Sequence, residues 1–212
     1  MTNFQIFFSQ IGYEESFLSK KYGYHSNAQA YIRSLLPHLQ ADFCHSSLGT
    51  QVKIQVEGDF IFYEGMFVEP TEYGIESMKE TTEKDLGDAD LMLYMVALCD
   101  QSLGTREDCY GGIAYISTVC IETKKNQFKQ SLNGLLSTVS ATAQIMAHEV
   151  GHNLGMWHDH EPFHQEAGCD KTGIMSYYVT TNQWSTCSKA DFHAHYLNNK
   201  DDWCLERNFF KT

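Results

Sequence analysis

The residues best suited to chemistry lie between positions 148 and 158, where histidines and a glutamate follow a regular spacing. His148 and His152 are four residues apart, so on a helix their imidazole rings share one face, a turn apart. This separation suits two nitrogens that bind one Zn²⁺ at about 2.0 to 2.1 Å each. Glu149 follows the first histidine, so it can approach a water on the metal without becoming a ligand. The pattern predicts a metal site with an adjacent base.

Two further residues make this pattern specific. Gly155 predicts the end of the helix, because glycine tolerates the positive φ of a sharp reversal. The reversal can then bring His158 to the metal as a third ligand. Three protein ligands leave one position open for water, which distinguishes a catalytic zinc site from a structural one. His-Glu-x-x-His alone arises by chance, but Gly155 and His158 at these offsets make coincidence improbable.

The elements that must position this stretch follow from the hydrophobic pattern. Apolar side chains recur at helical spacing over residues 131–153, which predicts the helix that carries His148 and His152. Further helices are predicted over residues 27–43, 73–84 and 189–197, the last capped by Ser188, and strands over residues 4–8, 51–62, 91–98 and 112–119. Loops dominate after Gly155. The chain is therefore predicted to be one α/β domain, with an N-terminal subdomain over residues 1–154 and a smaller C-terminal subdomain over residues 155–212.

Composition excludes several classes of partner. The chain has 212 residues, which fits a single domain, and a formal net charge of −12. Nucleic acids and anionic membranes reward clustered Lys and Arg, so neither is expected as a partner. No apolar stretch approaches the roughly 18 to 20 residues that span a bilayer, so direct membrane insertion is not expected.

At this point the residues resemble a known family. His-Glu-x-x-His-x-x-Gly-x-x-His is the metzincin signature, and Met175 in Gly-Ile-Met-Ser resembles the methionine turn that lies beneath the histidines of that clan. The aspartate directly after the third histidine, Asp159, resembles the residue found at that position in the adamalysin (reprolysin, ADAM-type) proteases. The resemblance implies the metzincin fold, with a twisted, mixed, mostly parallel sheet with helices and a smaller irregular C-terminal subdomain below the zinc cleft.

The resemblance also implies where substrate binds. The stretch that begins Gly112-Ile113-Ala114 resembles the strand along which the family's substrates lie extended. Tyr177 stands two residues after Met175, an offset similar to that of astacins and serralysins, in which this tyrosine reaches the metal. Adamalysins usually lack this ligand, and the alternative is that Tyr177 lines the substrate-side wall of the cleft. Both roles stay open for Tyr177.

The seven cysteines contain no Cys-x-x-Cys pair, so a cysteine zinc site or redox motif is not expected. The resemblance implies disulfides Cys120–Cys204 and Cys169–Cys187. A short intervening loop suggests a third, Cys99–Cys109, which would leave Cys44 free. Three bridges indicate an oxidising compartment, and hence a secreted or extracellular protein.

The residues together predict a zinc-dependent endopeptidase that acts on protein or peptide substrates. The resemblance implies a precursor with a prodomain or further modules. It leaves Ca²⁺ open: the first strand offers Gln5 where relatives have an acidic residue, while Asp88 and Asn208 could still serve. The alternative is a metzincin-fold binding module or toxin component with little hydrolytic activity. The presence of Glu149 favours the enzyme.

Overall fold

The computed structural model of the chain describes residues 4–14, 24–56, 58–66, 68–87, 89–97, 110–119, 128–177 and 181–199. Within them six strands form one sheet in the order β2-β1-β4-β6-β5, and β3 also pairs with β1. Every described pairing is parallel except that of β5 with β6. The predicted α/β class with a mixed, mostly parallel sheet is confirmed. The strands are β1 (Phe4–Glu14), β2 (Gln51–Val56), β3 (Ile61–Tyr63), β4 (Leu91–Val96), β5 (Gly112–Ala114) and β6 (Gln130–Gly134).

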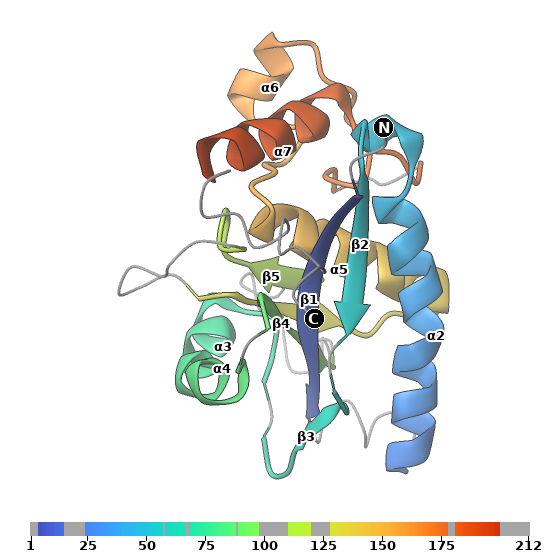
Figure 1. Cartoon of the computed structure of the whole chain (residues 1–212), viewed down its shortest axis with the longest axis vertical. Coiled ribbons are helices and arrows are strands. Elements are labelled where there is room, and N and C mark those ends of the chain that lie inside the picture. The colour runs from blue at the N-terminus through green and yellow to red at the C-terminus, as the bar shows by residue number, and fades with distance from the viewer. Residues whose placement is uncertain are drawn as a thin grey trace, which may run out of the picture.

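Helices cover both faces of the sheet. In β4, Leu91, Leu93 and Met95 join the core cluster formed with α2 and α5, while alternate residues of the strand join a second cluster with α3 and α4. This two-sided burial explains why the strand is apolar throughout. Figure 1 shows α6 and α7 together at one end of the molecule, apart from α3 and α4. The helices are α2 (His25–Phe43), η1 (Ser46–Leu48), α3 (Glu72–Ser77), α4 (Lys79–Asp85), α5 (Val139–Asn153), α6 (Pro162–Glu166) and α7 (Thr186–Asn199).

The predicted helix over residues 131–153 is wrong in its first part. Residues 131–134 belong to β6, and α5 begins at Val139 behind its N-cap Thr138, whose side chain accepts from the N–H of Ala141. β6 lies between β4 and β5 and is buried along its whole length. The side chain of Asn133 donates to the carbonyl of Tyr94 at 3.2 Å. Pairing with distant strands therefore outweighed a local apolar pattern that also suited a helix.

Three other predicted elements are shorter or interrupted. The strand over residues 51–62 is divided into β2 and β3, with Gly58 at a positive φ between them. The helix over residues 73–84 is two helices, α3 and α4, which meet at the buried Met78. The strand over residues 112–119 ends with β5, because the chain turns away before Ser117, which has φ 61°.

The helix predicted over residues 27–43 is confirmed as α2, which continues through Pro37 with its apolar face buried on both sides of that residue. The start of the last helix differs from expectation. α7 begins at Thr186, and the hydroxyl of Ser185 accepts from the N–H of Ser188, so the cap is Ser185 and not Ser188. None of the helices in the described residues has both the length and the apolar character that a membrane crossing needs. The division of the chain after residue 154 stays a prediction.

Candidate metal centre and cleft

Three imidazole rings converge where α5 ends. His148 and His152 lie one turn apart on α5, and the chain reverses at Gly155, which has φ 91°. The reversal places His158 opposite them: its Nε2 lies 3.1 Å from Nε2 of His152 and 3.2 Å from Nε2 of His148. Four ligands arranged tetrahedrally at about 2.05 Å would hold neighbouring nitrogens roughly 3.3 Å apart. The spacing of the three nitrogens therefore fits a zinc ion.

The backbone decides which nitrogen of each ring faces the centre. Nδ1 of His148 lies 2.7 Å from the carbonyl of Ile174, and Nδ1 of His152 lies 2.8 Å from that of Met156. A carbonyl accepts, so each Nδ1 carries the hydrogen and each Nε2 presents a lone pair. Nε2 of His158 lies near both lone pairs and can donate its one hydrogen to only one of them, so a cation among the three nitrogens satisfies the set more fully. The donor set therefore fits a metal.

Burial keeps these rings neutral. It lowers the pKa of His148 to about 4, helped by the charge of His158, and lowers that of His158 to about 4, helped by His160. Burial also lowers the pKa of His152 well below its usual value. Neutral imidazole is the form that binds metal.

The methionine turn packs directly beneath the helix. Met175 is fully buried, and a Cβ added at Gly151 would lie 2.6 Å from its sulfur, so the glycine in the last turn of α5 admits this contact. The N–H of Asp159 donates to the carbonyl of Met175 at 3.0 Å. This hydrogen bond connects the methionine turn to the segment that carries His158. The turn therefore supports both the helical histidines and the segment that carries His158.

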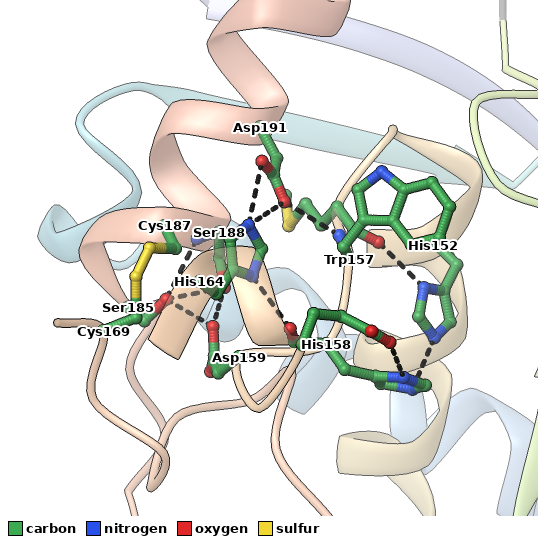
Figure 2. Close-up of polar contacts among 12 residues, drawn as sticks. His152, Trp157, His158, Asp159, His164, Cys169, Ser185, Cys187, Ser188 and Asp191 are labelled. Atoms are coloured by element: carbon green, nitrogen blue, oxygen red, sulfur yellow. Dashed lines mark hydrogen bonds and ion pairs between the residues drawn. A yellow bond between two sulfur atoms is a disulfide. The ribbon is translucent and has the colours of Figure 1, made fainter. Parts of the chain in front are cut away.

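The carboxylate of Asp159 is fully buried and accepts from three hydroxyl groups. Ser176 donates at 3.1 Å. Ser188 donates at 2.9 Å, and Ser185 also donates (Figure 2). These serines come from the methionine turn and from the start of α7. The carboxylate of Asp159 therefore connects its own segment to two others. The sequence analysis placed Asp159 in the site but missed its partners, because residues 17 to 29 positions away carry no local signal.

Glu149 occupies the floor of a cleft beside the histidines. The cleft has a volume of about 700 Å³. Glu149 is 3% exposed, and burial raises its pKa well above the usual value. A Cβ added at Gly112 would lie 2.6 Å from Oε1 of Glu149, so β5 can pass this close only with glycine there. The lining includes the predicted substrate residues Gly112, Ile113, Ala114 and Tyr177 together with His148, His152 and His158.

Tyr177 stands at the rim of this cleft. Its side chain is 67% exposed, and its ring centroid lies 4.7 Å from that of His158 and 4.1 Å from that of His160. The ring therefore packs against the third histidine from the solvent side. Tyr178 lies outside the described residues.

One of the three expected disulfides falls on described residues. Cys169 and Cys187 are joined, with their Cα atoms 5.9 Å apart, and Cys44 is a free thiol. The predicted pairs Cys120–Cys204 and Cys99–Cys109 lie outside the described residues, as do Asp88 and Asn208 of the open calcium site. The side chain of Gln5 is not described either.

Comparison with known families gives a match to the catalytic region. Residues 95–208 match the family model described as "Reprolysin (M12B) family zinc metalloprotease". The chain is 28% identical over 186 residues to "A disintegrin and metalloproteinase with thrombospondin motifs 20" of Homo sapiens, which covers 77% of this chain and 9% of that protein. It is 30% identical over 206 residues to "A disintegrin and metalloproteinase with thrombospondin motifs 19" of Mus musculus, covering 84% of this chain and 16% of that protein.

Two further matches are shorter or more distant. "Zinc metalloproteinase/disintegrin" of Bitis gabonica is 35% identical over 92 residues, 42% of this chain and 26% of that protein. A chain in the solved "Structure of a chaperone-substrate complex" shares 14% sequence identity at a TM-score of 0.57, and the match covers 85% of this chain and 28% of that one. At this identity the structural match supports the fold alone. The chain spans a small part of the length of each of these proteins.

Proposed function

The chain belongs to the reprolysin (M12B) family of zinc metalloproteases, and from this premise we propose that it is an endopeptidase that cleaves extended segments of protein substrates. The observation that carries the proposal is the convergence of three imidazole nitrogens beside a buried carboxylate on the floor of an open cleft. Neither part would suffice alone, because histidine clusters also form structural sites and buried carboxylates also form core networks.

In this proposal His148, His152 and His158 hold the zinc ion. A zinc ion there would supply Lewis acidity, which would polarise the substrate carbonyl and lower the pKa of a water towards about 7. The chain supplies the neutral form of the three rings, through burial and through the carbonyl partners of Nδ1 on His148 and His152. His158 has a carboxylate near its own Nδ1, since Oε1 of Glu161 lies 3.6 Å away.

Glu149 acts as the general base. Its Oε2 is buried without a hydrogen-bond partner in the described part of the chain, so this oxygen is available to take a proton from the attacking water. A carboxylate whose pKa is raised by burial is a better proton acceptor near neutral pH. Glu149 then passes the proton to the leaving amine. Gly112 keeps the space that the carboxylate needs.

The substrate pairs with β5. This strand ends the sheet order and bonds to β6 on one side, so its other edge has no partner strand among the described residues. Gly112, Ile113 and Ala114 line the cleft along this edge. An extended peptide can add there as a further strand, and main-chain hydrogen bonds would then hold it across the metal.

The biological setting completes the proposal. The Cys169–Cys187 disulfide supports a secreted or extracellular protein, because such bonds persist in oxidising compartments. The small share of each relative that the chain spans supports a precursor with a prodomain or further modules. The alternative remains a binding module or toxin component that hydrolyses little.

The decisive experiment combines a peptidase assay with metal analysis. The zinc-loaded chain is expected to cleave a denatured protein, and a chelator is expected to stop the cleavage. Glu149→Ala and the isosteric Glu149→Gln should each lower kcat by about 10²- to 10⁴-fold, because general-base catalysis contributes that much. Both variants should retain zinc, since Glu149 is not a ligand. A wild-type chain that binds zinc but cleaves nothing would favour the binding module, and a variant with activity near wild type would refute the role of Glu149.

A further inference from the structure

The third histidine, His158, differs from His148 and His152 in the contacts that fix its backbone. His148 and His152 belong to α5, whose hydrogen bonds fix their backbone. His158 lies between α5 and α6, in a segment that belongs to neither helix. A metal ligand outside regular structure has more conformational freedom, so its position depends on contacts from other elements.

Two side chains, the buried His164 and the partly exposed Asp191, contact the backbone of His158 and of the residue before it. Oδ2 of Asp191 accepts from the N–H of Trp157 at 2.9 Å, and Nδ1 of His164 donates to the carbonyl of His158 at 2.8 Å. The same two side chains contact each other, with Nε2 of His164 3.2 Å from Oδ2 of Asp191. Figure 2 shows the resulting closed ring, which runs from Trp157 through Asp191 and His164 back to His158.

The side chains of the ring lie on two helices, α6 and α7, and a disulfide lies close to both. His164 lies on α6 and is 4% exposed, and Asp191 lies on α7. The Cys169–Cys187 disulfide joins the segment just after α6 to the first turn of α7. Helices linked in this way keep His164 and Asp191 at a constant separation, so the peptides that they hold are also kept in place.

We propose that His164 and Asp191 are positioning residues that hold His158 in the geometry required of a metal ligand. The inference rests on the proposed function in one respect, namely that His158 binds zinc. Neither side chain reaches the zinc-facing nitrogens. Their effect passes through the backbone on both sides of His158, so it concerns metal affinity and metal geometry before it concerns turnover.

The test measures zinc affinity by competition with a chelator of known affinity. His164→Ala and Asp191→Ala should each weaken zinc binding by about 10- to 100-fold, the range found when groups that orient metal ligands are removed. The double variant should bind little worse than either single variant, because the two side chains form one ring. His164→Asn should recover much of the affinity, since its amide N–H can replace Nδ1 as donor to the carbonyl of His158.

A spectroscopic measurement separates positioning from general destabilisation. In the Co²⁺-loaded chain, His164→Ala should change the intensity and position of the d–d absorption bands, and His164→Asn should restore them. His193→Ala is the matched control, because His193 also lies on α7 and its Nε2 has no hydrogen-bond partner among the described residues. It should leave affinity and spectrum unchanged.

Each outcome is informative. If the wild-type chain binds zinc and the alanine variants bind it equally well, or melt at lower temperature with an unchanged Co²⁺ spectrum, the positioning role is refuted and the proposed function stands. If His164→Ala does not fold, Asp191→Asn and His164→Asn decide the question with smaller changes. If the wild-type chain binds no zinc, the proposed function itself fails.

Discussion

At the scale of single residues, the site depends on which atom of each side chain already has a backbone partner. The carbonyls of Ile174 and Met156 occupy Nδ1 of His148 and His152, so both tautomers are set before any metal arrives. Gly112 leaves Glu149 its space by having no side chain. In the proposed mechanism, these contacts hold the rings and the carboxylate in place before substrate binds, which lowers the reorganisation that catalysis would otherwise require.

Tyr177 offers a residue-scale prediction, because its ring and its hydroxyl can be tested separately. The ring packs against His158 and His160, and the side chain is 67% exposed. We expect Tyr177→Phe to keep kcat within about twofold, since the ring contact is retained. Tyr177→Ala should raise KM, because it removes the aromatic ring that lines the rim of the cleft. Steady-state kinetics on both variants test this. A fall in kcat of roughly tenfold or more for Tyr177→Phe at constant KM would instead assign the hydroxyl to catalysis.

At the scale of elements, the packing of α2 against α5 supports the helix that carries two of the histidines. The hydroxyl of Tyr31 on α2 lies 2.8 Å from that of Thr142 on α5, and apolar residues of both helices share one core cluster. The last turn of α2 includes Asp42, which is 5% exposed. Burial raises the pKa of Asp42 to about 6. Ionisation of Asp42 therefore lowers the stability of the folded chain, so an element that positions the site also makes this stability depend on pH.

The direction in which Asp42 changes the free energy of unfolding with pH gives a prediction at the scale of elements. The pKa of Asp42 in the folded chain lies above its ordinary value of 3.8, so its contribution to stability is full below pH 3.8 and is lost as pH rises through about 6. We expect Asp42→Asn to stabilise the metal-free chain by about 1 to 2 kcal/mol at pH 8 and by little at pH 4. Denaturant unfolding at both pH values measures the difference. Glu83→Gln, an exposed change on α4, is the control. An equal effect at both pH values would show that the charge of Asp42 is not responsible.

At the scale of the whole molecule, the proposed metal site joins α5 to the segment that follows it. Two of the proposed ligands lie on α5, and the third lies in the segment that leads to α6. The disulfide and the buried Asp159 tie this later part together. A metal bound at the junction should therefore stabilise the complete fold, because it binds the folded chain and finds no such arrangement in the unfolded one.

Metal removal tests this coupling. At pH 7, zinc at 100 times its dissociation constant should add about 2.7 kcal/mol to the free energy of unfolding. The pKa values of His148 and His158 are lowered to about 4 in the folded chain. Stability from their neutral form is therefore complete above pH 6.5 and is lost as pH falls through about 4. Zinc-dependent stabilisation should persist to about pH 5 and disappear near pH 4.

Thermal unfolding between pH 4 and 8, with and without zinc, measures the effect. A chain carrying His148→Ala serves as control and should show little dependence on zinc. Zinc-dependent stabilisation that is already lost near pH 6.5 would mean that the histidines titrate as exposed groups, against the burial seen here. No zinc effect at pH 7 would contradict the metal site as a whole.

The sequence by itself determined the candidate metal residues and the α/β class, because both follow from short-range patterns. His148 and His152 share a helix face whatever the rest of the chain does, and Gly155 permits the reversal that leads to His158. The apolar run in β4 likewise predicts a strand buried on both faces. In each case the pattern spans a few residues and needs no partner to be recognised.

The tertiary structure alone decided the supporting contacts. Asn133 lies in a strand because β4 lies beside it, although the local pattern also suited a helix. Asp159 meets Ser188, and His164 meets Asp191, across separations of 29 and 27 residues. Polar side chains of these types are common on surfaces, and nothing in their spacing reveals a partner. Such contacts form when separate elements pack and bury them, so their identity becomes visible only in the folded chain.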